Sequence, residues 1–578
     1  MGETTGIAPA DTALTPQERR LIACAARGEW WRPEAIEGQD ADPANADGWS
    51  SARRLRAELI HCLIAGDIWP GEAQPWALGP KGLRIEGAFV AGAFDLEGAT
   101  LRGTLWLHRC VFDERLNFAD ATTRTISLSG SHLRRGLVAP RVTIRGALLL
   151  SHGFRASGGI DIRDARIDGQ LGCSGGRFEN PGGVALDAGA LTAEVVYLNR
   201  GFSATGEVCL IGARIERQLD CIAGTFDNAG GFAINATSLA VGHSLQLRDG
   251  FCAHGEVNLV RATIGGSLRC EHATFSNAPG LAIDLSMAHV DAGFSLHNLR
   301  PAPGATRGLE GRLILDQAQC RTYCDDPRAW PEPGQLVLDG FVYERFHASD
   351  TRWRTRKDWL KHQVRGHLDG SFRPQPWTQT INVLRAMGHD GDARELAVQR
   401  ELARARSKGT GGVEKFWLYA LNVFVGNGYK PWRAAWWSAL FVALGWFVFA
   451  SAGEQGYMAP RDGNVRVSEA WNVAPPKVPR LPKTYPPFNA LAFAFDSYLP
   501  VIAFEQDESW EPSTQKTLRS VQAAPDRALL GLTPRWLTLP DGFFAGGWHR
   551  LLYWILEILG WIFVSLFIAG MSGIMKKE

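Results

Sequence analysis

The sequence predicts a mainly β protein: a parallel β-helix (solenoid) with a helical N-terminal cap, a helical connector and two transmembrane helices. The solenoid is predicted by an internal repeat, because segments 160–173, 208–221 and 257–270 align residue for residue at nearly equal offsets. Repeats of this kind, built on short strands, are typical of a stack of similar coils. Two apolar stretches near the C-terminus predict the membrane spans.

A finer period lies within the solenoid segment, as between Leu105-Trp-Leu107 and Leu116-Asn-Phe118. Alternating apolar and polar residues place one face of each short strand inside and the other outside. Such strands bury an apolar column only when they are stacked, and each large repeat should make about two coils. Cys173, Cys221 and Cys270 are expected to form an interior ladder of small hydrophobic side chains.

Five segments follow one another along the chain. Thr15 and Glu18 form a predicted capping box that starts a helix ending near Arg27, and a second helix is expected over 50–65. These two helices should cover the open end of the first coil. A turn-rich insertion is expected at 320–333. The predicted organisation is 1–14 disordered, 15–81 helical N-terminal cap, 82–346 parallel β-solenoid, 347–412 basic helical connector and 413–578 membrane domain.

The membrane domain divides by the lengths of its apolar runs. The predicted parts are an interfacial helix at 413–425, a transmembrane helix at 432–452, an extracytoplasmic loop at 453–549 and a second transmembrane helix at 551–573. Positive charges flank both spans on the sides away from the loop, namely Lys408, Lys415, Lys430 and Arg433 before the first and Lys576 and Lys577 after the second. The positive-inside rule therefore predicts a multi-pass protein of the bacterial inner (cytoplasmic) membrane, with the solenoid and both termini in the cytoplasm.

Composition restricts the classes of partner. The net charge is +1, so nucleic acid is not expected as a partner. The ten cysteines show no disulfide spacing, and the polar N-terminus has no apolar signal-peptide core, which fits a reducing compartment. The lipid bilayer is the expected partner, together with a protein partner or a second copy of the chain.

Segment 488–504 is the first candidate site. It is about 17 residues long, which is short for a span, and Pro500 interrupts it. One interpretation is a re-entrant pore helix, with Asp496 or the acidic residues Glu505, Asp507 and Glu508 forming a cation-attracting ring in an oligomer. The other interpretation is an amphipathic helix on the outer leaflet. Glu557, inside the second span, could line a pore or relay protons, or could reach the outer interface.

The basic stretch after the solenoid is the second candidate. Its cations are interleaved with tryptophans and lie next to the membrane domain, so they are expected to contact anionic lipid. The candidate lipid-contacting residues are Arg352, Arg354, Arg356, Lys357 and Lys361.

Sequence motifs predict no catalytic, cofactor-binding or metal site. Cys320-x-x-x-Cys324 with His347 offers one close ligand pair, whereas zinc sites usually show two. Charged residues such as Asp161, Arg163 and Asp168 could line a polysaccharide-processing face, but they equally suit a solvated surface. No dinucleotide-binding or phosphate-binding glycine motif is present.

Several motifs together resemble a group of bacterial membrane proteins with a pentapeptide-repeat-like or bactofilin-like β-solenoid and a two-span C-terminal anchor. The motifs are Arg53-x-x-Arg56-Ala-Glu-Leu-Ile, Ile85-Glu-Gly-Ala, Phe94-Asp-Leu96-Glu-Gly-Ala, Pro374-Gln-Pro-Trp-Thr-Gln379, Leu384-Arg-x-Met-Gly-His389, Gly428-Tyr-Lys-Pro-Trp432-Arg and Asp496-x-x-Leu-Pro500-Val. Such proteins are often labelled membrane-associated oxidoreductases, and the resemblance would imply a redox cofactor. The finer period here, from Leu105 to Leu116, departs from a strict five-residue spacing.

The sequence as a whole favours a membrane-anchored cytoplasmic solenoid that acts as a binding, scaffold or self-associating module, with no catalysis evident. Two alternatives stay open. One is an oligomeric two-span pore-loop channel gated by the solenoid, and the other is a membrane-associated oxidoreductase.

Overall fold

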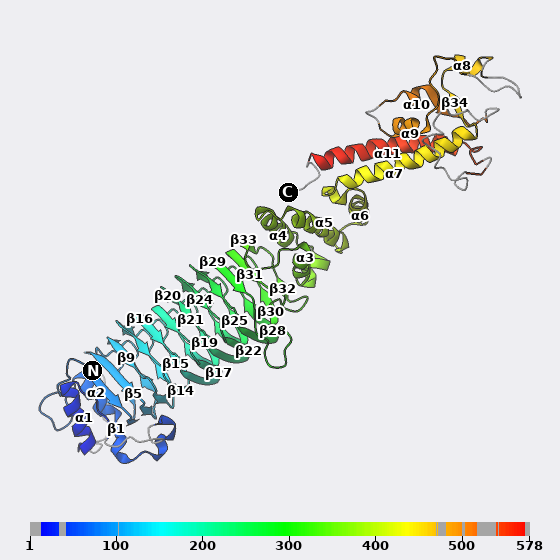
Figure 1. Cartoon of the computed structure of the whole chain (residues 1–578). Coiled ribbons are helices and arrows are strands. Elements are labelled where there is room, and N and C mark those ends of the chain that lie inside the picture. The colour runs from blue at the N-terminus through cyan, green and yellow to red at the C-terminus, as the bar shows by residue number, and fades with distance from the viewer. Residues whose placement is uncertain are drawn as a thin grey trace, which may run out of the picture. The chain divides into compact units, whose positions relative to one another are not determined.

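The computed structural model describes residues 13–33, 42–101, 103–469, 471, 481–499, 503–516, 539–540 and 543–572. The chain forms two compact units, Met1–Leu396 and Ala397–Glu578. The first contains the solenoid with its caps, and the second contains the helices of the predicted membrane domain (Figure 1). Most of the segment predicted to be disordered, residues 1–12, lies outside the described residues.

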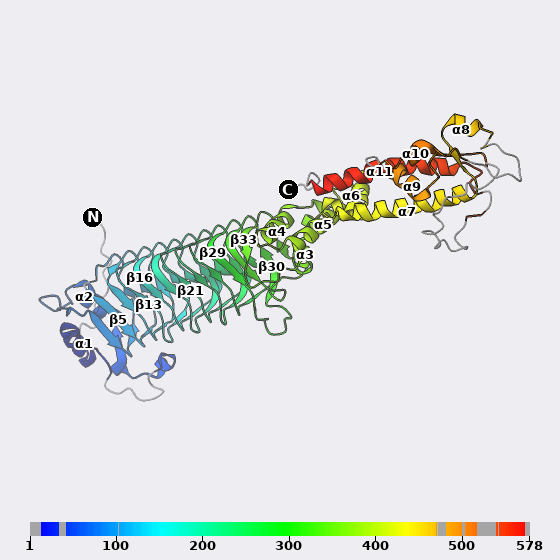
Figure 2. The ribbon, with the colours of Figure 1, turned by 45° about the horizontal axis from the view of Figure 1, so that its top comes forward.

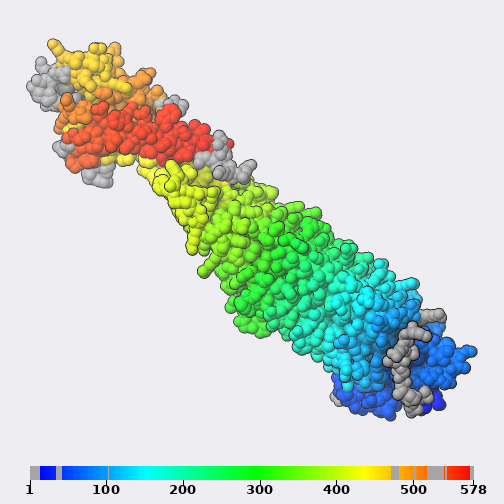
Figure 3. Space-filling view, turned by 180° about the vertical axis from the view of Figure 1, so that it is seen from behind, coloured from blue at the N-terminus to red at the C-terminus, as the bar shows by residue number. Residues whose placement is uncertain are grey.

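The predicted solenoid is confirmed. It makes about 11 turns, from β2 (Leu83–Glu86) to β33 (Val342–Phe346), which agrees with the predicted range 82–346. Its strands pair in parallel with the coils before and after, as Figure 2 shows from the side. Successive coils form one continuous surface from the cyan to the green part of the chain (Figure 3).

Two long sheets make up the walls of the solenoid. The 16-stranded sheet contains β1 (Arg54–Arg56), β3 (Phe89–Ala91), β4 (Phe94–Asp95), β6 (Val111–Phe112), β7 (Leu116–Asn117), β10 (His132–Leu133), β11 (Leu137–Val138), β14 (Arg155–Ser157), β15 (Ile160–Asp161), β17 (Arg177–Asp187), β19 (Ser203–Cys209), β22 (Thr225–Asn235), β25 (Cys252–Asn258), β28 (Thr274–Asp284), β30 (Leu309–Ile314) and β32 (Leu336–Val337). The 17-stranded sheet contains β2, β5 (Thr104–His108), β8 (Thr122–Thr123), β9 (Thr125–Ser127), β12 (Thr143–Ile144), β13 (Leu148–Leu149), β16 (Arg166–Gly172), β18 (Thr192–Tyr197), β20 (Arg214–Ile215), β21 (Leu219–Asp220), β23 (Ala240–Val241), β24 (Leu245–Gln246), β26 (Thr263–Ile264), β27 (Leu268–Arg269), β29 (His289–Leu296), β31 (Gln319–Asp325) and β33.

Strand register explains both sequence periods. Within one coil, strands β10, β11, β12 and β13 begin at residues 132, 137, 143 and 148, so the finer period is the sum of two adjacent sides of a coil. Between coils, Arg177 pairs with Ser203 and Ser203 pairs with Thr225, so a longer coil is followed by a shorter one. One long and one short coil therefore make up the larger repeat, as the sequence predicts.

The interior is built from ladders of apolar side chains. Six phenylalanines stack from coil to coil with ring centroids 5.1–5.6 Å apart. They are Phe154, Phe178, Phe202, Phe226, Phe251 and Phe275. Aromatic pairs at this spacing add favourable contacts beyond the burial of apolar area.

The predicted cysteine ladder is confirmed as interior but is wrong in its contacts. Cys173, Cys221 and Cys270 are all buried. The register Gly172–Tyr197–Asp220–Gln246–Arg269 places Leu198 and Leu247 between them in the same column. The cysteines therefore alternate with leucines, because they recur once per two-coil repeat rather than once per coil.

The N-terminal cap differs in part from the prediction. Helix α1 (Pro16–Arg27) begins with the predicted capping box of Thr15 and Glu18 and ends at Gly28 in the left-handed conformation. The predicted helix 50–65 is wrong in its first half. A 3₁₀ turn (Ser51–Arg53) and β1 come first, and α2 runs only from Ala57 to Ala65. Strand β1 pairs in parallel with β3, so the cap extends the sheet and covers its edge.

The C-terminal end of the solenoid is closed by helices α3 (Trp353–Lys361) and α4 (Gln375–Ala386), with a π-helical turn (Gly366–Gly370) between them. Helix α5 (Asp390–Arg406) follows. Gln379 Nε2 of α4 donates to the backbone oxygen of Tyr343 in the last strand, which helps to cover that sheet edge. The predicted insertion 320–333 is wrong in its first part, because 319–325 is the regular strand β31.

The second unit holds two helices that are long and apolar enough to cross a membrane, which indicates a membrane-associated protein. They are α7 (Trp432–Glu454) and α11 (Trp548–Met571), close to the predicted ranges 432–452 and 551–573. Helix α6 (Gly412–Val425) covers the range 413–425, for which the sequence predicts a helix at the membrane interface. The remaining elements are a 3₁₀ turn (Gly426–Gly428), α8 (Gly463–Val467), α9 (Ala490–Tyr498), α10 (Gln506–Ser509) and an antiparallel pair, β34 (Met458–Pro460) and β35 (Trp510–Pro512).

Candidate functional site

A groove of about 890 Å³ runs across the outer face of the 17-stranded sheet in the first half of the solenoid. Successive coils line this groove. In each coil the lining residues come directly before and after a buried leucine or cysteine, and these buried residues form one column in the interior. Gly172 lies between Leu149 and Tyr197 in register, and its missing side chain leaves room for Leu149, whose Cδ2 atom would lie 3.0 Å from a Cβ atom there. The side chains discussed below are His108, Ser127, Ser129, Ser151, Ser174, Asn199 and Asp220.

Hydrogen bonds fix the polar side chains of this groove before any partner binds. His108 Nε2 lies 2.9 Å from Ser127 Oγ, and the hydroxyls of Ser127, Ser129 and Ser151 follow one another at 3.2 Å. The chain ends at His152 Nδ1, 2.8 Å from Ser151 Oγ. Side chains held in this way lose little conformational freedom on binding, which favours affinity.

A second polar group continues the groove toward the C-terminal coils. Ser174 Oγ donates to Asn199 Oδ1 at 2.6 Å, and Asn199 Nδ2 donates to Asp220 Oδ2 at 2.7 Å. Asn199 and Asp220 are buried in the free chain, yet both line this outer face. Buried polar groups arranged to recognise a partner discriminate against partners that leave them unpaired.

An aromatic cluster closes the N-terminal end of the groove. The Trp106 ring meets Trp30 edge to face at 6.3 Å and His108 at 5.2 Å, and the buried Trp106 Nε1 has no hydrogen-bond partner. Burial lowers the pKa of His108, and Arg109 and His152 lower it further. His108 is therefore neutral at physiological pH and can accept as well as donate hydrogen bonds.

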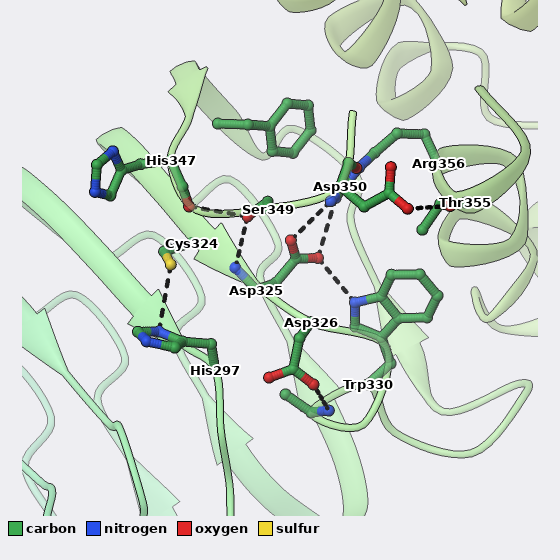
Figure 4. Close-up of polar contacts among 12 residues, drawn as sticks. His297, Cys324, Asp325, Asp326, Trp330, His347, Ser349, Asp350, Thr355 and Arg356 are labelled. Carbon is green, nitrogen blue, oxygen red and sulfur yellow. Dashed lines mark hydrogen bonds and ion pairs between the residues drawn. The ribbon is translucent and has the colours of Figure 1, made fainter. Parts of the chain in front are cut away.

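A buried ion pair joins the end of the solenoid to helix α3, as Figure 4 shows. Asp325 follows Leu296 in register, so its carboxylate takes the place that leucine and cysteine fill in earlier coils. Arg356 binds both carboxylate oxygens, at 3.1 and 2.9 Å, and Trp330 Nε1 donates to the same group at 2.8 Å. The guanidinium also lies 4.1 Å from the Phe346 ring centroid. A charge at this depth is tolerated because it is paired and fully hydrogen-bonded.

The lipid-contact prediction is wrong for Arg356. Its side chain is 1% exposed and holds the cap helix on the solenoid, so it is not available to a membrane. Arg352, Arg354, Lys357 and Lys361 lie on the same helix or at its start and are not buried. Arg352 pairs with Asp350, and this hydrogen-bonded contact holds the pKa of Asp350 far below its usual range. Arg354 and Lys357 lie against the Trp353 ring.

Of the cysteine pair in β31, Cys324 contacts a histidine, which is His297 and not the His347 considered from the sequence. Cys324 Sγ lies 3.3 Å from His297 Nδ1 (Figure 4), and both Cys320 and Cys324 are buried. Burial raises the pKa of Cys320 to about 12 and that of Cys324 to about 11, so both are thiols at neutral pH. In the part of the chain that the structure describes, no three His, Cys, Asp or Glu side chains gather as metal ligands.

Helix α9, within the segment predicted to re-enter the membrane, packs against both long helices. Phe493 meets Phe449 of α7 at 4.9 Å and Tyr553 of α11 at 5.8 Å between ring centroids. At the other end of α9, Tyr498 Oη lies 3.0 Å from Ser438 Oγ of α7. The Tyr498 carbonyl lies against Gly560, which stands halfway along α11. Helix α9 therefore extends to the middle of the helix pair.

The predicted ion-binding residues are separated by this packing. Asp496 is buried, and its two carboxylate oxygens accept the backbone N–H groups of Phe504 and Gln506 at 2.5 and 2.7 Å. Asp496 thus closes the loop after α9, while Glu505 is exposed with a left-handed backbone. Asp507 is half-buried, and burial raises its pKa, with Asp496 adding to the shift. Glu557 is exposed on α11.

No protein-family model, curated protein or solved structure matches the chain. The assignment of a role therefore rests on geometry.

Sequence reasoning missed the groove and the Asp325–Arg356 pair. The groove residues stand beside the interior positions Leu128, Leu150, Cys173 and Leu198, so the signal was present. Successive coils differ in length, however, so these positions can be aligned with one another only from the strand register. The sequence signal for the ion pair was a carboxylate, Asp325, at an expected core position. Arg356 is the basic residue that pairs with it.

Proposed function

We propose that the chain is a membrane-anchored binding module, in which the solenoid is a rigid support and its groove holds a partner. The observation that carries this proposal is the chain of pre-ordered polar side chains in the groove, from His108 to Asp220. These hydroxyl and amide groups lie on the outer face of the sheet and hydrogen-bond to one another. The apolar core lies on the other side of the strands, so these groups are not needed to pack it.

The proposed location is the bacterial inner membrane, with the solenoid and both termini in the cytoplasm. The positive charges before α7 support this orientation, and Lys576 and Lys577 lie outside the described residues. The ten cysteines are all free, which fits a reducing compartment. Protease treatment of intact spheroplasts should leave the solenoid intact, and treatment of inverted vesicles should cleave it. The opposite pattern would contradict the orientation.

The binding role is tested by photo-crosslinking in cells. A benzoylphenylalanine at Leu149, on the groove floor between Ser127 and Gly172, should give a discrete adduct. The matched control is the same group at Ile211, which is exposed but does not line the groove. Adducts at Ile211 alone, or at neither position, would contradict a partner in the groove.

Of the alternatives, the pore-loop channel has one supporting observation, because α9 reaches the middle of the two long helices. Its proposed ion-attracting group is less favourable, since Asp496 already accepts two backbone N–H groups. Planar-bilayer recording of the purified chain tests it, and conductance that is lost in Asp496→Asn would support it. No specific observation within the described ranges favours the oxidoreductase alternative.

A further inference from the structure

One exposed face of α11 carries large apolar side chains together with one carboxylate. Trp554 is 53% exposed and Trp561 is 59% exposed, and Glu557 lies between them on the same face. A neighbouring face is buried, with Leu556, Gly560 and Phe563 packed inside the unit. Glu557 is therefore outside the helix bundle, where ionisable residues of membrane helices are rarely found.

These exposed residues follow a coiled-coil spacing. Positions 550, 554, 557, 561, 564, 568 and 571 alternate steps of four and three residues, and all are exposed except the half-buried Val564. Apolar residues with this spacing form the contact seam between two supercoiled helices. We call this set the α11 seam; its members are Arg550, Trp554, Glu557, Trp561, Val564, Ile568 and Met571.

The depth of Glu557 makes exposure to lipid unfavourable. It is nine residues from the start of α11, about 13 Å at the rise of an α-helix, and further still from its end. A carboxylate at such a position needs a polar partner or a proton. Within the described parts of the two long helices the other charged groups are near the ends: Arg433 donates to the Asn422 carbonyl, Arg550 begins the seam, and Glu454 ends α7.

We propose that the α11 seam is covered by the α11 seam of a second copy of this chain. Two copies inserted with the same topology have parallel α11 helices, so a two-fold axis brings the two Glu557 side chains to the same depth. Each Glu557 side chain then has a polar hydrogen-bonding partner across the axis, inside the membrane. Symmetry places the Glu557 side chain of a second copy at the same depth as the first. An unrelated helix would have a polar group at this depth only by coincidence, and a lipid chain has none.

The inference rests on the membrane anchoring proposed above, and cysteine crosslinking tests it. All ten native cysteines lie between Cys24 and Cys324, so an introduced cysteine is the only one in the second unit. In membranes treated with copper phenanthroline, the full chain with Trp561→Cys should form a disulfide-linked dimer several-fold more than Ile562→Cys. Ile562 is 46% exposed at the same depth but lies off the seam, and the unsubstituted chain sets the background.

Replacing the Glu557 carboxylate by a positive charge in one of two copies tests whether the partner is a second copy of the chain. With two differently tagged copies co-expressed, the Glu557 chain should co-purify with Glu557→Lys, and two Glu557→Lys chains should co-purify several-fold less. Glu557→Gln should keep the Trp561→Cys crosslink, since two amides also hydrogen-bond to each other.

Three results would overturn the inference. They are equal crosslinking at positions 561 and 562, a crosslink to a chain of different mass, or equal recovery of the Lys–Lys and Glu–Lys pairs. Recovery of the protein in the soluble fraction would instead contradict the membrane anchoring itself, so the two failures are distinguishable.

Discussion

The two units differ in the kind of residue that they expose. The solenoid packs phenylalanine, leucine and cysteine inside and places its ion pairs, such as Arg141 with Asp120, at exposed corners. The second unit also has an apolar core, with Phe449, Phe493 and Trp510 inside, but it exposes tryptophan, leucine and isoleucine along α6, α7 and α11. Among the described residues, only Ile68, Ile211, Met287 and Val342 of the first unit are exposed large hydrophobic residues, and all the others belong to the second unit.

This difference indicates two different surroundings. A water-soluble surface rarely keeps a continuous apolar face, whereas a surface against lipid requires one. The solenoid obeys the first rule, and α7 with α11 obeys the second. The exceptions are then informative: Asp325 is a charge in the apolar interior of the solenoid, and Glu557 is a charge on the apolar exterior of α11.

Removing the partner of Asp325 should have the largest effect. Arg356→Met leaves a buried, unpaired carboxylate, and the expected loss is about 3–5 kcal/mol of unfolding free energy. Urea unfolding of the detergent-solubilised chain, followed by circular dichroism, measures it. The exposed Arg354→Met is the matched control and should change little.

The double variant Asp325→Leu/Arg356→Leu sharpens that result. It replaces the pair by apolar side chains and restores the leucine of the interior column, so most of the lost stability should return. A double variant as unstable as Arg356→Met would show that the charge itself is not the cause.

The phenylalanine ladder should be almost as sensitive. Phe226→Ala removes a ring stacked between Phe202 and Phe251, and the cavity should cost about 3–5 kcal/mol. Ile211→Ala, on the exposed surface, is the control. Equal midpoints for the two variants in urea would contradict a close-packed solenoid interior.

Packing in the second unit depends on Gly560. A Cβ atom there would lie 1.6 Å from the Tyr498 carbonyl oxygen, so Gly560→Ala must displace α9 and should cost about 1–3 kcal/mol. Maleimide labelling of a cysteine placed at the buried Ser497 should become faster in this variant. Gly546→Ala, whose Cβ meets nothing within 4 Å, should leave labelling unchanged.

A smaller effect of pH is expected at Glu256 of β25, which lines a notch together with residues of β22 and β28. Burial raises its pKa from 4.5 to about 7, with a contribution from nearby Asp284. The folded chain therefore binds more protons than the unfolded chain between these values, so its stability falls as the pH rises through this window. Glu256 is half-exposed, and solvent screening reduces the expected effect to about 1 kcal/mol.

Glu256→Gln removes this penalty. The variant should be more stable than the unsubstituted chain at about pH 8 and equally stable at about pH 4, as measured by thermal unfolding at both values. A difference of the same size at both pH values would assign the effect to packing instead.

The sequence predicted the solenoid, its limits and the long helices well, because each is written in a local pattern. The repeats that begin at 160, 208 and 257 predict the stacked coils, and uninterrupted apolar runs predict α7 and α11. It failed where contact between distant segments decides the structure. Residues 54–56 form a strand rather than a helix because β3 offers them an open edge, and Arg356 is buried because Asp325 lies under it.

The candidate groove could not be predicted for a related reason. Ser129, Ser151, Ser174 and Asn199 are ordinary polar residues in sequence, and the spacing between them is unequal. Only the register of the coils brings them into one line. The position of Glu557 on the outer face of α11 likewise depends on which face α7 and α9 cover.

Alkaline carbonate extraction of membranes from cells that express the full chain tests the central claim most directly. The account predicts that the chain stays with the membrane pellet, because α7 and α11 expose an apolar surface that is stable in contact with lipid and unstable in contact with water. Release of the chain into the supernatant, as a folded and soluble protein, would contradict it.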